Sequence, residues 1–198
     1  MSVARAVLRV SGAVTVALPW LSILLSMTVN HWFNPLKGAF SDLGSAAATD
    51  PWFFNYGLVV SAVFVAAFSL ALMRLSKNKL ETAGGAFLLV AALFLAMIGI
   101  FHEGTYPHDF VSYWFFLQAD LAVGAIGVGR IFAREGGKGS FLTAWSFAWP
   151  IVATLITWPS TAALEAFGIA SLDVAVLVLI LSRKNAFTIE YNEVWALV

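Results

Sequence analysis

Residues 102–109, with the sequence HEGTYPHD, place two histidines, a glutamate and an aspartate within eight positions. Imidazole and carboxylate groups move protons in acid–base catalysis, and they also bind zinc and other divalent cations. His108 is therefore expected to act as a base, with Glu103 or, from the last span, Glu165 as an acid. Alternatively, His102 and His108 bind a metal ion. No metal ligand set is assigned, because the HExxH spacing that places two histidines on one helix face is absent.

Two further carboxylates, Asp120 and Asp173, interrupt long apolar runs. An acidic residue near the middle of a bilayer costs roughly 2.5–3.5 kcal/mol on insertion scales, so such a residue is a functional candidate by default. If the two side chains face each other, they can carry a proton that is coupled to the transport of a solute. Alternatively, each carboxylate forms only a hydrogen bond to a neighbouring helix.

The elements that position these residues are apolar helices. Hydrophobic residues make up 61% of the 198 residues and charged residues only 11%, which is typical of an integral membrane protein. The sequence predicts an all-α polytopic membrane protein in which residues 1–198 form one domain of six transmembrane helices. The predicted spans are near residues 7–30, 51–74, 83–101, 109–132, 141–158 and 164–182.

Composition also excludes several classes of function. The absence of cysteine rules out thiol nucleophiles and cysteine metal sites, and a formal net charge of zero without a basic face argues against nucleic acid as a partner. Membrane lipids are the expected partners, and nothing in the sequence indicates an oligomeric state. The only cofactor considered is a divalent metal such as zinc.

The positively charged residues predict the orientation of the helices, because lysine and arginine near helix ends stay on the cytoplasmic side. Ten of the eleven fall on one side of the predicted spans: Arg5, Arg9, Arg74, Lys77, Lys79, Arg130, Arg134, Lys138, Arg183 and Lys184. Only Lys37 lies on the other side. Both termini are therefore predicted to be cytoplasmic in a multi-pass protein of the cell membrane.

This topology gathers the polar residues on the outer side. Asp42 in the long first loop, the HEGTYPHD turn and Glu165 near the start of the last span all face that side. Asp109, Tyr113 and Asp120 share one face of the fourth span, because their spacings of four and seven residues match the helical repeat. A polar track from the outer turn towards the middle of the membrane is therefore expected, although Phe116 interrupts it.

Small residues mark where helices are expected to touch. Gly85, Ala92, Ala96 and Gly99 recur along the third span, and Gly129 lies in the fourth. Such residues let helix backbones approach closely in lipid, where association depends on packing. These residues are therefore predicted to form contacts between helices of the bundle.

Several stretches resemble a family of multi-pass prokaryotic membrane proteins catalogued as domain of unknown function nine-nine-eight. They are Asn34–Pro35, the FSDLG sequence at 40–44, Asn55 with Gly57, and Gly99–Phe101 with Glu103 and His108. The resemblance implies about six helices with polar motifs on one side, and it supplies no reaction. It favours Asp42, Asn55, Glu103 and His108 as site residues.

These observations lead to three hypotheses. The first is a membrane-embedded enzyme that acts on a lipid or lipid-linked substrate, with His108, Glu103, Glu165 and Asp42 as catalytic residues. Asp42 would orient a histidine or a metal, and the substrate would contact Ser41, Asn55, His102, Asp109 and Tyr113. The second is a proton-coupled transporter of a small solute that uses Asp120 and Asp173, and the third is a noncatalytic membrane sensor or assembly partner.

Overall fold

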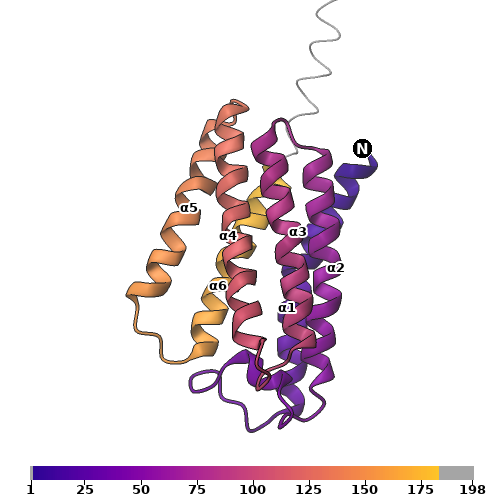
Figure 1. The fold of residues 1–198 in the computed structure, drawn as a ribbon, viewed down its shortest axis with the longest axis vertical. Coiled ribbons are helices and arrows are strands. Elements are labelled where there is room, and N and C mark those ends of the chain that lie inside the picture. Colours follow the sequence, from indigo (N-terminus) through magenta and orange to yellow (C-terminus); the bar gives the residue numbers. More distant parts are fainter. Residues whose placement is uncertain (1, 183–198) are drawn as a thin grey trace, which may run out of the picture.

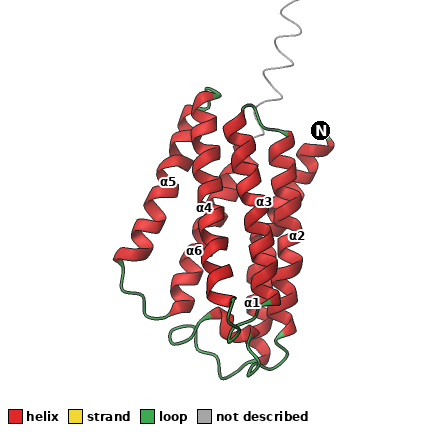
Figure 2. Ribbon diagram, in the orientation of Figure 1, coloured by secondary structure: helices red, strands yellow, loops and turns green. Residues whose placement is uncertain are grey.

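The computed structural model describes residues 2–182 and consists of six α-helices. They are α1 (Val3–Val29), α2 (Trp52–Arg74), α3 (Lys79–Ile100), α4 (His108–Phe132), α5 (Gly136–Leu155) and α6 (Thr161–Ser182), and a short 3-10 helix, η1 (Phe40–Gly44), lies between α1 and α2 (Figure 1). The described part of the chain contains helices and loops only (Figure 2). The predicted all-α class is confirmed. Arg183 and Lys184, on which part of the predicted orientation depends, lie outside the described residues.

Five of the helices, all except α5, are long and apolar enough to cross a membrane. They identify the chain as a membrane protein with transmembrane helices. The fifth predicted span, 141–158, corresponds to α5, which begins earlier, at Gly136, and ends at Leu155. Its first half, GGKGSFLT, contains Lys138 together with glycines, a serine and a threonine, and among the described helices α5 is the one that does not meet the length and apolarity needed to cross a membrane.

Sequential helices pack side by side. α3 lies between α2 and α4, α1 packs against α2, and α4 against α5, whereas α5 and α6 touch much less. In Figure 1, α5 leans away from α4 towards the α5–α6 loop. A cavity lined by residues of η1, α4, α5 and α6 lies at the end of the molecule that carries η1.

Close helix contacts occur at the predicted small residues. A side chain at Gly99 of α3 would collide with the backbone carbonyl of Asn55 in α2, and one at Gly129 of α4 would lie 2.9 Å from the backbone nitrogen of Glu81 in α3. The predicted role of these glycines in helix packing is confirmed.

Hydrogen bonds hold the loop that contains η1 against two helices. Asn55 Nδ2 of α2 donates to the carbonyl oxygen of Gly44 over 2.9 Å, and the backbone nitrogen of Ala162 in α6 donates to the carbonyl oxygen of Gly38 over 2.8 Å. Phe40 and Leu43 of η1 are buried in the apolar core. Because these contacts fix η1 from both sides, the polar residues between them have defined positions.

Candidate functional site

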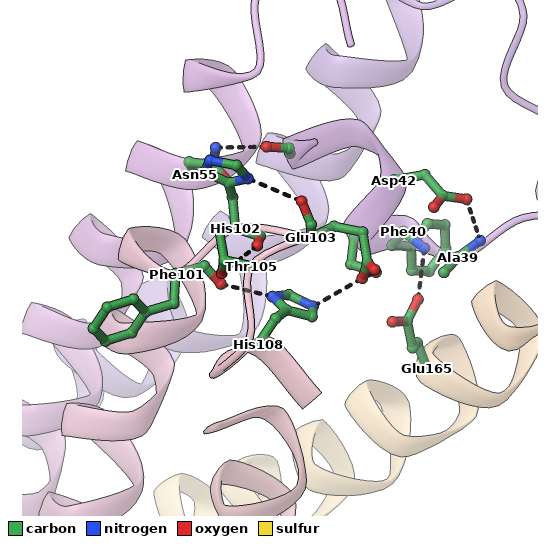
Figure 3. Close-up of polar contacts among 12 residues, drawn as sticks. Ala39, Phe40, Asp42, Asn55, Phe101, His102, Glu103, Thr105, His108 and Glu165 are labelled. Atoms are coloured by element: carbon green, nitrogen blue, oxygen red, sulfur yellow. Dashed lines mark hydrogen bonds and ion pairs between the residues drawn. The ribbon is translucent and has the colours of Figure 1, made fainter. Parts of the chain in front are cut away.

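His108 is the first residue of α4 and is only 5% exposed. Its Nδ1 atom lies 2.8 Å from the carbonyl oxygen of Phe101 at the end of α3 (Figure 3). A carbonyl oxygen can only accept a hydrogen bond, so Nδ1 carries the hydrogen. Nε2 lies 3.1 Å from Oε2 of Glu103. Both ring nitrogens are therefore engaged, and the turn between α3 and α4 fixes the ring.

Glu103 connects this histidine to η1. The Oγ atom of Ser41 donates to Oε2 of Glu103 over 2.8 Å, and this is the same oxygen that contacts His108. The Glu103 side chain keeps 34% of its surface exposed, against 6% for His108. The arrangement is a chain of three groups, Ser41, Glu103 and His108, in which the carboxylate is central and is the most accessible to another molecule.

Only one proton fits between His108 Nε2 and Glu103 Oε2. Without a proton there, two lone pairs would face each other 3.1 Å apart, because Nδ1 already holds the hydrogen that is donated to Phe101. The pair is therefore either an imidazolium with a carboxylate or a neutral imidazole with a carboxylic acid. A pair that holds one mobile proton is suited to acid–base chemistry.

Two other expected catalytic residues hold the loop. Oε2 of Glu165 accepts a hydrogen bond from the backbone nitrogen of Phe40 over 2.6 Å, and Oδ2 of Asp42 accepts one from the backbone nitrogen of Ala39 over 2.8 Å (Figure 3). Asp42 was expected to orient a histidine. In the structure, the group that contacts Nδ1 of His108 is the carbonyl oxygen of Phe101. Sequence reasoning missed Phe101 because a backbone carbonyl leaves no signal in residue type.

Beside these groups lies an outer cavity of about 620 Å³ between η1, α4, α5 and α6. Five residues named in the sequence hypotheses line it together with Ser41 and His108: Asp42, Glu103, Asp109, Tyr113 and Glu165. A second, inner cavity of about 140 Å³ lies among α1, α2, α3, α4 and α6. Five residues line both cavities: Ser41, His108, Ser112, Phe116 and Glu165.

Ser112 is the polar residue in this set that the sequence hypotheses did not include. It lies four residues after His108, so the two side chains occupy one face of α4. That spacing was the available signal, but a serine within a long apolar helix is unremarkable until the cavities are known.

Two expected substrate ligands lie elsewhere. Asn55 and His102 line neither cavity. Asn55 holds Gly44 of η1, and Nδ1 of His102 contacts the carbonyl oxygen of Glu103 over 2.9 Å. Both side chains therefore support the loops around the site.

The two intramembrane carboxylates have separate tryptophan partners. Trp149 Nε1 of α5 donates to Oδ1 of Asp120 over 2.7 Å, and Trp20 Nε1 of α1 donates to Oδ2 of Asp173 over 2.8 Å. Asp173 lines the inner cavity, whereas Asp120 lines neither cavity. This arrangement matches the expectation that each carboxylate joins neighbouring helices.

The possible metal site has no counterpart in the geometry. Across residues 2–182, no three histidine, aspartate or glutamate side chains are placed together so that they could hold a metal ion. His102 and His108 instead contact backbone carbonyls through Nδ1.

A comparison with known protein families finds a match. A family model described as "Protein of unknown function (DUF998)" matches residues 13–182, a range that includes η1 and the turn between α3 and α4. No curated protein and no solved structure matches the chain.

Proposed function

The chain belongs to the DUF998 family of proteins of unknown function, and we propose that it is a membrane-embedded enzyme that acts on a lipid or lipid-linked substrate. The observation that carries this proposal is the chain of Ser41, Glu103 and His108 beside a cavity of about 620 Å³. A cavity of this size accommodates a polar headgroup. Five of the residues that line this cavity also line the inner, mostly apolar cavity. The two cavities together therefore suit a substrate with a hydrocarbon part.

The chemistry follows from the single proton held by His108 and Glu103. In the form with a carboxylate, Glu103 removes the proton from a water molecule or a substrate hydroxyl as that oxygen forms a bond to an ester centre. The same proton then passes to the leaving oxygen as its bond breaks, which restores the carboxylate. His108 offsets the charge of the carboxylate and holds its position. No oxidant, reductant or cofactor is needed for such a hydrolysis or transfer.

We further propose that α5 is a sixth span and that the site faces outward from the cell membrane. Arg5, Arg9, Arg74, Lys79 and Arg130 belong to the ends of α1 to α4 opposite the cavity, and Lys37 belongs to the loop beside it. By the preference of positive charges for the cytoplasm, this distribution supports a cytoplasmic N-terminus. The even number of spans then supports a cytoplasmic C-terminus as well.

The enzyme proposal can be tested with the purified full chain in lipid nanodiscs that contain a total prokaryotic lipid extract. Mass spectrometry would follow the loss of any lipid and the appearance of its product. We expect turnover by the natural chain and loss of at least about 100-fold in Glu103→Gln, since general acid–base groups contribute 10²–10⁴-fold. Native hydrogen bonds to Ser41 and His108 can partly persist with glutamine, so the fold is expected to survive.

His31→Gln and Asp50→Asn are matched controls, because both residues are exposed and line neither cavity. Equal turnover in Glu103→Gln and the natural chain would refute the proposal. Specific binding of a lipid without any turnover would instead support the sensor hypothesis. The transporter hypothesis has less support, because Asp120 and Asp173 are each bound by a different tryptophan.

A further inference from the structure

The inner cavity is long, narrow and mostly apolar. Its lining on α4 extends from His108 to Ile126, about 27 Å along the helix axis at the usual rise per residue. Its volume is only about 140 Å³. Its walls include Ile23, Leu58, Leu95, Val123, Leu172 and Leu179, which come from five helices. Such a shape suits an aliphatic chain better than a compact group.

Polar residues of the inner cavity gather where it meets the outer one. Four of them, Ser41, His108, Ser112 and Glu165, line both cavities. Deeper along the helices the polar lining consists of Thr15 and Asp173, and the Asp173 carboxylate is bound by Trp20. The inner cavity therefore offers hydrogen-bonding groups at its junction with the outer cavity and a mainly apolar wall beyond it.

The outer cavity has an acidic lining. Asp42, Glu103, Asp109 and Glu165 line it, and none of its described lining residues is a lysine or an arginine. An anionic group such as a phosphate would face four acidic side chains with His108 as the only basic one. Carboxylates accept hydrogen bonds, so a group that donates them, such as a hydroxyl or an ammonium, fits this lining.

We infer that the two cavities together bind an amphiphile whose hydrocarbon chain enters the inner cavity and whose non-anionic, hydrogen-bond-donating head lies in the outer cavity beside Glu103. This inference deepens the proposed function and rests on it only in placing the reacting group at Glu103. An apolar cavity of about 150 Å³ takes up benzene, so the volume of the inner cavity corresponds to a chain segment of about six carbon atoms, which occupies part of the length of the lining.

Binding of single-chain probes to the full chain in phosphatidylcholine nanodiscs tests this inference. The probes are n-alkylamines and 1-O-alkylglycerols, with n-alkyl phosphates as the anionic comparison. Affinity is expected to rise about fourfold for each added methylene until about six carbons are buried, and then to level off. The phosphates are expected to bind at least about tenfold more weakly than amines of equal length, because the lining of the outer cavity is acidic.

Two variants with a matched control separate specific binding from partition into lipid. Ala175 is 1% exposed and lines the inner cavity, so Ala175→Leu should reduce affinity for the longer probes by about tenfold or more. Ala170→Leu makes the same change at an exposed position of α6 and should leave affinity unchanged. Ile169→Ala removes volume from the lining, so the affinity should continue to rise for about three more carbons.

The results distinguish this inference from the proposed function. One possible result is binding that depends on chain length and is weakened by Ala175→Leu, without any turnover. This result supports the inference and contradicts the proposal that the protein is an enzyme. Turnover with equal binding of all chain lengths, or with equal effects of Ala175→Leu and Ala170→Leu, overturns the inference and leaves the enzyme. Tighter binding of the phosphates than of the amines would overturn the assignment of the head.

Discussion

Nε2 of His108 lies 3.1 Å from Oε2 of Glu103, while Nδ1 of the same ring lies 2.8 Å from the carbonyl oxygen of Phe101. The ring is thus held between two oxygens at the start of α4. The His108 side chain is 6% exposed and the Glu103 side chain 34%, and both residues line the outer cavity. In the proposed reaction Glu103, the more exposed of the two, is the proton acceptor and His108 positions it, whereas residue type favoured His108 as the base and Glu103 as the acid.

If His108 and Glu103 work as one unit, the effects of the two single substitutions on kcat should not multiply in the double variant. We expect Glu103→Gln and His108→Gln each to lower kcat by about 100-fold or more, and the double variant to lose little beyond the larger single effect. KM should change less than kcat, because the pair handles a proton and the cavity walls hold the substrate. Steady-state kinetics in nanodiscs would measure both. Multiplied losses in the double variant would mean that the two residues act independently.

Glu165 is expected to hold η1 through its hydrogen bond with the backbone nitrogen of Phe40, which is 2.6 Å long. Glu165→Gln retains an oxygen acceptor and should keep the melting temperature close to that of the natural chain. Glu165→Leu leaves the backbone nitrogen of Phe40 without this acceptor, and it should lower the free energy of unfolding by about 1–3 kcal/mol. Thermal unfolding in nanodiscs compares the two. Equal melting temperatures for both variants would show that the bond does not anchor the loop.

Gly44 lies too close to α2 for a side chain. A Cβ atom there would collide with Oδ1 of Asn55 and lie 2.8 Å from Cδ1 of Phe54. Gly44→Ala should therefore destabilise the fold by about 1–3 kcal/mol, as overpacking does. Gly137→Ala is the control, because a Cβ atom at Gly137 of α5 meets nothing within 4 Å. An equal loss of melting temperature in the two variants would contradict this explanation.

Asp120 and Asp173 are expected to stabilise helix contacts through their tryptophan partners. Asp120→Asn keeps an oxygen that accepts from Trp149 and should change the free energy of unfolding by less than about 1 kcal/mol, whereas Asp120→Leu leaves the indole nitrogen without this acceptor. Lipid turnover should survive Asp120→Asn. A loss of proton-coupled solute uptake in proteoliposomes carrying Asp120→Asn would instead favour the transporter hypothesis.

The chain contains no cysteine, so single cysteines report the orientation directly. Tyr106→Cys lies in the turn between α3 and α4, where Tyr106 is fully exposed, and Gly137→Cys lies at the start of α5. A membrane-impermeant maleimide added to intact cells should label the first and not the second. Ser160→Cys, in the α5–α6 loop, should behave like Tyr106→Cys if α5 crosses the membrane. The reverse pattern would place the site on the cytoplasmic side.

The sequence by itself determined the helices and the end at which their polar residues meet. Long apolar runs predict helices because a helix satisfies its own backbone hydrogen bonds, and five of the six predicted spans match helices long and apolar enough to cross a membrane. The exception is α5, Gly136–Leu155, which begins with the polar sequence GGKGS and is not among the helices long and apolar enough to cross a membrane. FSDLG and HEGTYPHD were recognisable as site segments from residue type and from the family resemblance.

Only the tertiary structure decided which side chains meet. Ser41 and Glu103 are 62 positions apart, and Phe40 and Glu165 are 125 apart, so their contacts depend on how η1 is held between α2 and α6. The partner of His108 Nδ1 is a backbone carbonyl, and since every residue has one, the sequence does not indicate which carbonyl it is. The cavities are bounded by several helices at once, so they also depend on the packing of those helices. Residue type indicates which hydrogen bonds and proton transfers a side chain can take part in. A hydrogen bond requires its donor and acceptor to lie about 3 Å apart, and the packing of the helices determines which groups reach that distance.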